Sequence, residues 1–262
     1  IYRYENDELG TEPALIFEGD PGSGTPNRWG DNIAIRGSGS DTRILVGSRN
    51  GKQFSLIDPN TASVTTITVN GVGNDEFGLG VAFGAGNTFW AKVNNKPLYH
   101  IGFDGNILHT YNTLQNVGPI AVDPINNLLA ANAIGAENPN NLRLYDISNL
   151  NSEPALLDFE FYRHPSDNSP AFGTGAINFG NDGRIYALDE NQGIIAWQNA
   201  VPSSPILNVA FNGTSVELNW SGSFKLQSST VVEGPYSDVA TSSPFTENTT
   251  AASAKFFRLV NQ

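Results

Sequence analysis

Four short segments begin with glycine and continue as a brief apolar run: Gly30-Asp-Asn-Ile-Ala-Ile, Gly80-Val-Ala-Phe, Gly118-Pro-Ile-Ala-Val and Gly175-Ala-Ile-Asn-Phe. Further short apolar segments follow each of them, so that a unit of four strands recurs along the chain. A period of about 40 to 50 residues is typical of β-propeller blades, because one small sheet cannot bury both of its faces until neighbouring sheets stack on it. The sequence therefore predicts an all-β protein with four-stranded propeller blades.

The repeats predict three complete blades and three strands of a fourth. Hairpin residues such as Asn50-Gly51 and Asp104-Gly105 separate the strands. The predicted strands are 32–36, 43–47, 53–58 and 64–69 in the first blade; 81–83, 88–93, 98–103 and 107–111 in the second; 120–123, 127–132, 142–146 and 155–161 in the third; and 176–179, 184–189 and 193–197 in the fourth.

The two ends of this array predict an incomplete ring. Residues 1–6 and 14–18 resemble the third and fourth strands of a blade, which gives seventeen strands, one more than four blades hold. Since most propellers have more blades, we interpret Ile1 as lying in mid-blade, with an upstream portion removed or separate. Unpaired edges favour strand addition, so we expect residues 1–4 or 193–197 to pair with a protein partner or an upstream fragment that completes the propeller. The alternative is a compact ring in which residues 1–18 complete the blade of 175–197.

The composition changes near Val201, where Pro202-Ser-Ser-Pro is typical of a linker. Alternating apolar and polar residues predict half-buried antiparallel strands at 206–211, 215–220, 224–229, 236–240 and 255–260. We therefore predict two domains: propeller blades in 1–200 and a small C-terminal β-sandwich in 201–262.

Charge and sulfur content restrict the classes of function. The net charge of −12 repels phosphate backbones, which excludes nucleic acid as a partner, and no apolar run reaches the ~18 residues that span a bilayer. Cysteine and methionine are both absent, so thiolate metal sites and catalytic cysteine are excluded. The lack of oxidisable sulfur suits an oxidising, secreted or cell-surface location.

Four C-terminal segments carry a resemblance to known proteins: Leu218-Asn-Trp-Ser-Gly-Ser-Phe-Lys-Leu-Gln-Ser-Ser, Glu233-Gly-Pro-Tyr-Ser-Asp-Val, Ser243-Pro-Phe-Thr and Ala254-Lys-Phe-Phe-Arg-Leu-Val. Together they resemble a C-terminal module of secreted bacterial proteins of the Verrucomicrobia and Planctomycetes type. The preceding blades resemble uncharacterised secreted propellers and, more loosely, NHL and lactonase-like propellers. The resemblance implies export and an extracellular role, and it implies no reaction.

Residues just before each innermost strand converge at the mouth of a propeller channel, which makes them the candidate ligand-binding residues. They are Arg28, Trp29, Asp31, Asn32, Asp75, Glu76 and Asn116. Three carboxylates near the axis match the oxygen ligands that calcium prefers. The alternative is that these acids are ordinary solvated loop residues, so the metal stays open.

A second candidate group lies in the loop Tyr162-Arg-His-Pro-Ser-Asp-Asn, where His164 and Asp167 suit a base and the residue that orients it. Neither a Gly-x-Ser-x-Gly turn nor a His-Glu-x-x-His helix accompanies them. Tryptophans stack on sugar rings in some sites, but strand tryptophans at blade spacing more often pack between blades. Trp29, which precedes its strand, is the best candidate for a carbohydrate contact.

Two functions follow from these observations. The first is a non-enzymatic extracellular scaffold for binding or assembly, which the missing catalytic motifs favour. The second is a secreted hydrolase or lyase acting on a sugar or lactone, with or without calcium, through Asp31, Asp75, Glu76 and His164.

Overall fold

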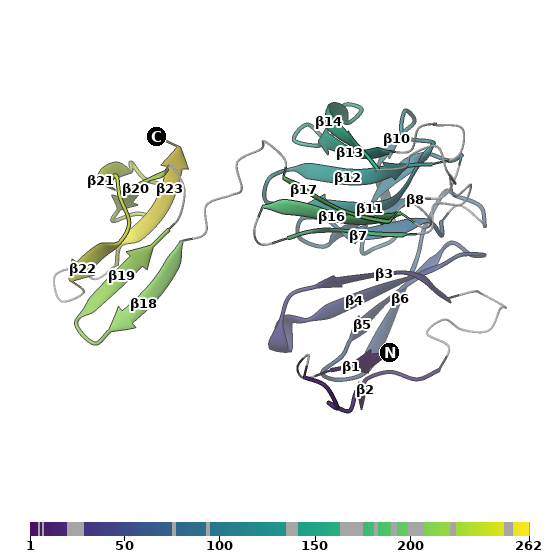
Figure 1. Cartoon of the computed structure of the whole chain (residues 1–262), viewed down its shortest axis with the longest axis horizontal. Helices are drawn as coiled ribbons and strands as arrows, with labels where there is room; N and C mark the ends of the chain where they lie inside the picture. The colour runs from purple at the N-terminus through teal and green to yellow at the C-terminus, as the bar shows by residue number, and fades with distance from the viewer. Residues whose placement is uncertain are drawn as a thin grey trace. The chain divides into compact units, whose positions relative to one another are not determined.

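The computed structural model describes residues 1–4, 6, 8–19, 29–74, 77–92, 95–134, 141–162, 175–180, 183–189, 193–198, 207–220, 224–248 and 254–261 (Figure 1). The chain forms two compact units, Ile1–Pro202 and Ser203–Gln262. Its described elements are strands and one short 3-10 turn, Gly39–Asp41. No helix in this part of the chain is long and apolar enough to cross a bilayer.

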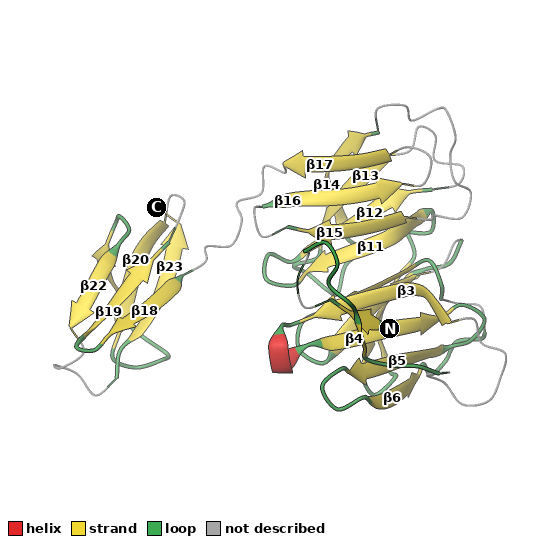
Figure 2. Ribbon diagram, turned by 60° about the horizontal axis from the view of Figure 1, so that its bottom comes forward, coloured by secondary structure: helices red, strands yellow, loops and turns green. Residues whose placement is uncertain are grey.

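Besides a two-stranded sheet at its start, the first unit contains four larger antiparallel sheets, which we call blades 1 to 4 (Figure 2). Blade 1 consists of β3 (Trp29–Arg36), β4 (Arg43–Ser48), β5 (Gln53–Asp58) and β6 (Ser63–Thr68); blade 2 of β7 (Gly80–Phe83), β8 (Thr88–Lys92), β9 (Leu98–Gly102) and β10 (Ile107–Tyr111); blade 3 of β11 (Val117–Asp123), β12 (Leu128–Ala133), β13 (Asn141–Asp146) and β14 (Ala155–Phe161); and blade 4 of β15 (Gly175–Phe179), β16 (Arg184–Asp189) and β17 (Gly193–Gln198). The predicted propeller of four-stranded blades is confirmed.

Asx turns, in which an aspartate side chain accepts a backbone N–H two residues later, close several of these hairpins. The carboxylate of Asp58 accepts the backbone N–H of Asn60 at 2.9 Å, and the carboxylate of Asp104 accepts that of Asn106 at 3.0 Å. These hydrogen bonds favour the charged carboxylate and lower the pKa of both aspartates. Asp58 and Asp104 therefore stabilise the turns in which they lie.

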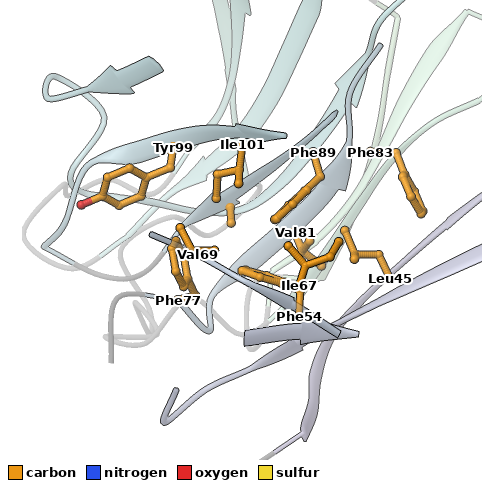
Figure 3. Close-up of a cluster of buried hydrophobic side chains, with 11 residues drawn as sticks. Leu45, Phe54, Ile67, Val69, Phe77, Val81, Phe83, Phe89, Tyr99 and Ile101 are labelled. Carbon is orange, nitrogen blue, oxygen red and sulfur yellow. The ribbon is translucent and has the colours of Figure 1, made fainter. Parts of the chain in front are cut away.

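The blades stack through three apolar clusters, one at each junction. Phe54 of blade 1 meets Phe89 of blade 2 at a ring-centroid distance of 4.7 Å, inside the cluster drawn in Figure 3. Trp90 and Leu129 belong to the cluster between blades 2 and 3, and Trp197 belongs to that between blades 3 and 4. The innermost strands β3, β7, β11 and β15 consequently lie side by side in chain order.

A small hairpin of β1 (Tyr2–Arg3) and β2 (Ala14–Leu15) lies against the face of blade 1 that points away from blade 2 (Figure 1). Ile1 and Phe17 pack there on Ile44, Val46 and Ile57. The two strands pair with each other, as expected for the third and fourth strands of a blade. Within the described residues, β17 pairs with β16 alone, so the alternative ring with a ladder between residues 1–4 and 193–197 is not formed.

The second unit is a sandwich of two three-stranded sheets, which confirms the predicted architecture. One sheet has the order β18 (Asn208–Asn212), β19 (Ser215–Asn219), β22 (Phe245–Asn248), and the other β21 (Ser237–Ala240), β20 (Phe224–Ser229), β23 (Phe256–Asn261). Leu218, Trp220, Phe224 and Leu226 form its buried core. The sequence prediction lacked β22, because this strand is four residues long and only Phe245 in it is apolar.

Candidate functional site

A cavity of about 460 Å³ runs between the innermost strands of all four blades. Its lining is largely aliphatic, with Ile33, Val81, Ile120 and Ile177 each contributed by a different blade. The polar side chains in the lining are Asn32, Arg36 and Asn178. This is the volume of a small-molecule site, and its chemistry is that of a mostly apolar wall with a few hydrogen-bonding groups.

Arg36 stands at the end of β3 and reaches across to blade 2. Its Nη1 donates to the carbonyl oxygen of Gly86 at 2.6 Å, and its guanidinium lies 4.6 Å from the ring centroid of Phe83. Burial lowers the pKa of Arg36, and the nearby positive charge of Arg43 lowers it further. The guanidinium of Arg36 therefore joins blade 1 to blade 2 beside the channel.

The structure separates the predicted channel residues. Asn32 lines the cavity. Trp29 instead lines a second hollow of about 420 Å³ beneath the β1–β2 hairpin, on the outer face of blade 1. Asn116 lies in the turn before β11, where its backbone oxygen accepts the N–H of Ile134 at 3.0 Å.

The remaining candidates lie outside the described residues: Arg28, Asp75, Glu76, His164 and Asp167. Asp31 is placed only as part of the β3 backbone. Within the described part of the chain, no three histidine or acidic side chains gather as a metal site. Because the acids proposed for calcium are outside that part, the calcium site stays a prediction.

Sequence reasoning missed a tier of buried polar residues beside the channel entrance. Ser48, Lys92 and Asp189 end the second strands of blades 1, 2 and 4, and Asn132 is the penultimate residue of the second strand of blade 3. All four are at most 1% exposed. Ser48, Lys92 and Asp189 pair in register with Trp29, Gly80 and Gly175 at or beside the start of the innermost strands. The sequence does contain a signal for these residues, because a polar residue stands at or next to the end of the apolar second strand in each repeat.

This polar tier links neighbouring blades. The Lys92 ammonium donates to the backbone oxygens of Gln115, at 2.8 Å, and Lys96. The amide of Asn132 donates to the backbone oxygen of Leu188 in blade 4 at 3.3 Å and accepts the Tyr162 hydroxyl at 2.8 Å. Burial and the charge of Asp189 raise the pKa of Tyr162. These hydrogen bonds therefore join blade 2 to the segment that precedes blade 3, and blade 3 to blade 4.

Burial without full compensation lowers the pKa of Lys92 to about 7. An unfolded lysine titrates near 10.4, so between pH 7 and 9 the unfolded chain binds more protons than the folded chain, and stability rises with pH. We expect the free energy of unfolding to increase by about 2 kcal/mol over this window. Urea unfolding at several pH values measures it. Lys92→Met should flatten the slope, and an unchanged slope in that variant would assign the effect to other groups.

The histidines and tryptophans of the strands are packing residues. His100 is buried with its ring centroid 4.5 Å from that of Trp90, and burial together with His109 lowers the pKa of His100 to about 4. Trp90, Trp197 and Trp220 are each at most 8% exposed. The interpretation of strand tryptophans as packing residues is confirmed for these three.

No protein-family model and no curated protein sequence matches the chain. Similar solved structures include the computationally designed Ika4 protein (TM-score 0.42, 13% identity, 67% of this chain and 94% of that one). They also include Kuenenia stuttgartiensis hydrazine synthase (0.39, 14%, 72% and 55%) and the β-propeller domain of Myceliophteria thermophila Cps50 (0.35, 13%, 73% and 63%).

The chain thus spans less than two thirds of the length of the latter two proteins. At these identities the comparisons concern the fold alone, and no functional residue is transferred from them. The four stacked antiparallel sheets and the channel that their innermost strands share make this chain a protein of the β-propeller type.

Proposed function

We propose that this protein is a non-enzymatic scaffold that assembles outside the cell, and that its first partner is a second copy of the same chain. The observation that carries this proposal is the pair of apolar sheet faces at the two ends of the blade stack. A propeller blade normally has a neighbour on each face, because its sheet is apolar on both sides.

The end face of blade 4 exposes large apolar side chains. Tyr186, Leu188 and Ile194 are 41%, 42% and 76% exposed, while Ile185 and Ala187, which alternate with them on β16, are buried against blade 3. Alternation of this kind means that the sheet has two apolar faces and covers one of them. The bare face is suited to another sheet.

The end face of blade 1 is the complementary surface. Ile33 and Ile35, which border the channel, are 50% and 65% exposed, and they pair in register with Val46 and Ile44. Val46 and Ile44 are themselves buried beneath Ile1 and Phe17, so the uncovered part of this face lies along β3. Blade 4 of one copy placed against blade 1 of another covers both faces, and a twofold axis repeats the contact. One pair of chains would thus cover the end faces of blade 1 and blade 4 in both copies.

The channel supports binding rather than turnover. Its described lining offers amide, guanidinium and apolar groups, which hold a ligand but supply neither a nucleophile nor a base at neutral pH. The absence of cysteine and methionine supports an oxidising location. Turnover of lactones or glycosides by the purified protein would instead favour the secreted hydrolase.

Sedimentation velocity over a concentration series tests the assembly. We expect a dimer that dissociates on dilution and that strengthens with added salt, since each copy carries a net charge of −12 and salt screens the repulsion. The double variant Leu188→Glu/Ile194→Glu should be a monomer. Ile125→Glu, at a side chain 75% exposed in the turn after β11, is the matched control and should still associate. A wild-type protein that stays monomeric at the highest concentration reached would overturn the proposal.

A further inference from the structure

Blade 4 has three strands in the described part of the chain. Blades 1, 2 and 3 each have four strands, whereas blade 4 has the order β15-β16-β17 in the described part of the chain. Among these residues, no strand pairs with the side of β17 that faces away from β16. Such an edge adds an extended strand readily, because the new hydrogen bonds are all between backbones.

A hollow of about 400 Å³ lies beside this edge. Residues 194–198 of β17 form one wall, and Glu160, Phe161 and Tyr162, at the end of β14, form the other. In the complete blades the fourth strand lies next to the third, as β14 does beside β13. The hollow is where a fourth strand of blade 4 would place its side chains.

The β1–β2 hairpin carries large, partly exposed apolar side chains. Tyr2, Tyr4 and Leu15 are 63%, 62% and 51% exposed, although Tyr2 and Leu15 also border the hollow beside Trp29. The hairpin is held to blade 1 through Ile1 and Phe17, and the Ile1 ammonium donates to the backbone oxygen of Phe17 at 2.7 Å. It thus lies on the same end face of blade 1 that the proposed dimer sets against blade 4 of the partner.

We propose that the β1–β2 hairpin of a second copy adds to the free edge of β17, so that each chain completes the fourth blade of the other. This inference rests on the proposed assembly and names the hairpin that joins the copies. The exposed tyrosines of the hairpin supply the large apolar side chains that the hollow beside β17 lacks.

The second copy is the occupant because the hairpin of the same chain is already engaged. It packs on blade 1, and no ladder joins it to β17 among the described residues. Addition in trans keeps those contacts and adds new ones, whereas addition within one chain requires the two ends of the stack to meet.

Cysteine cross-linking tests this directly, since the chain contains no cysteine of its own. One preparation carries Tyr2→Cys. The second carries a cysteine in place of Ile194, Ile195 or Ala196, together with a tag that gives it a different mass. The three positions sample the unknown register, and a disulfide forms only where two Cα atoms come within about 7 Å. The matched control replaces Ile125, at an exposed turn, with cysteine. After mixing and mild oxidation, non-reducing gels report a dimer of mixed mass.

We expect the mixed dimer with at least one β17 position and not with Ile125→Cys. A wild-type dimer in sedimentation together with no cross-link at any of the three positions would overturn the strand addition and leave the proposed assembly intact. A chain that carries Tyr2→Cys and a β17 cysteine together, and that cross-links within itself as a monomer, would overturn both.

Discussion

Replacing Phe54 with alanine is expected to lower the free energy of unfolding of the propeller unit by about 3 to 5 kcal/mol. Phe54 is 1% exposed and meets the rings of Phe77 and Phe89 edge-on, at centroid distances of 5.0 and 4.7 Å. Its removal leaves a cavity at the junction of blades 1 and 2, which the rigid sheets on both sides cannot collapse to fill.

Urea unfolding followed by far-ultraviolet circular dichroism measures the loss. The matched control is Phe159→Ala, because Phe159 is 45% exposed on β14 and its truncation opens no closed cavity. We expect a smaller loss there, below about 1.5 kcal/mol. Equal losses in the two variants would mean that the junction of blades 1 and 2 is not a packed core.

Replacing Gly105 with alanine is expected to cost about 2 to 4 kcal/mol, from a strained backbone and a steric clash together. Gly105 has φ of 81°, and a Cβ built on it would lie 2.1 Å from the backbone oxygen of Thr68 in blade 1. The carbonyl of Gly105 accepts the N–H of Asn70 at 2.9 Å, so this close approach of two blades is itself a hydrogen-bonded contact. The added methyl group must separate the blades.

Gly71→Ala separates strain from clash, since Gly71 has φ of 78° and no atom within 4 Å of its built Cβ. Strain alone should cost about 1 to 2 kcal/mol there. Thermal and urea unfolding of both variants give the comparison. If the two variants lose the same free energy of unfolding, the contact between the β9–β10 turn and blade 1 does not limit the distance between the two blades.

Local sequence patterns were sufficient for the strands of the blades. An Asp-Gly or Asn-Gly turn and alternation of apolar side chains act within a few residues, so segments such as 53–58 and 184–189 were predicted with the bounds that the structure shows. The same rule missed β22, whose single apolar residue gives no alternation to detect. Short strands that depend on their neighbours carry little local signal.

The candidate site was less accessible to sequence reasoning. Of the candidates at the start of β3, Asn32 lines the cavity, whereas Trp29 lies on the outer face of blade 1. A shift of register between Trp29 and Ile33 in the β3–β4 ladder lies between the two residues, and such irregularities redirect side chains. Lys92 and Asn132 were overlooked because a polar residue at the end of a strand is ordinarily solvated.

By itself, the sequence determined the all-β class, the four-strand repeat, the three described strands of blade 4 and the C-terminal sandwich, because hydrogen-bonded hairpins and alternating side chains are local properties of the chain. Only the tertiary structure decided which polar residues are buried beside the channel and which apolar faces remain bare. Burial depends on which sheets stack on which, and those contacts join residues far apart in the sequence, such as Asn132 with Leu188 and Arg36 with Gly86. No local pattern records them.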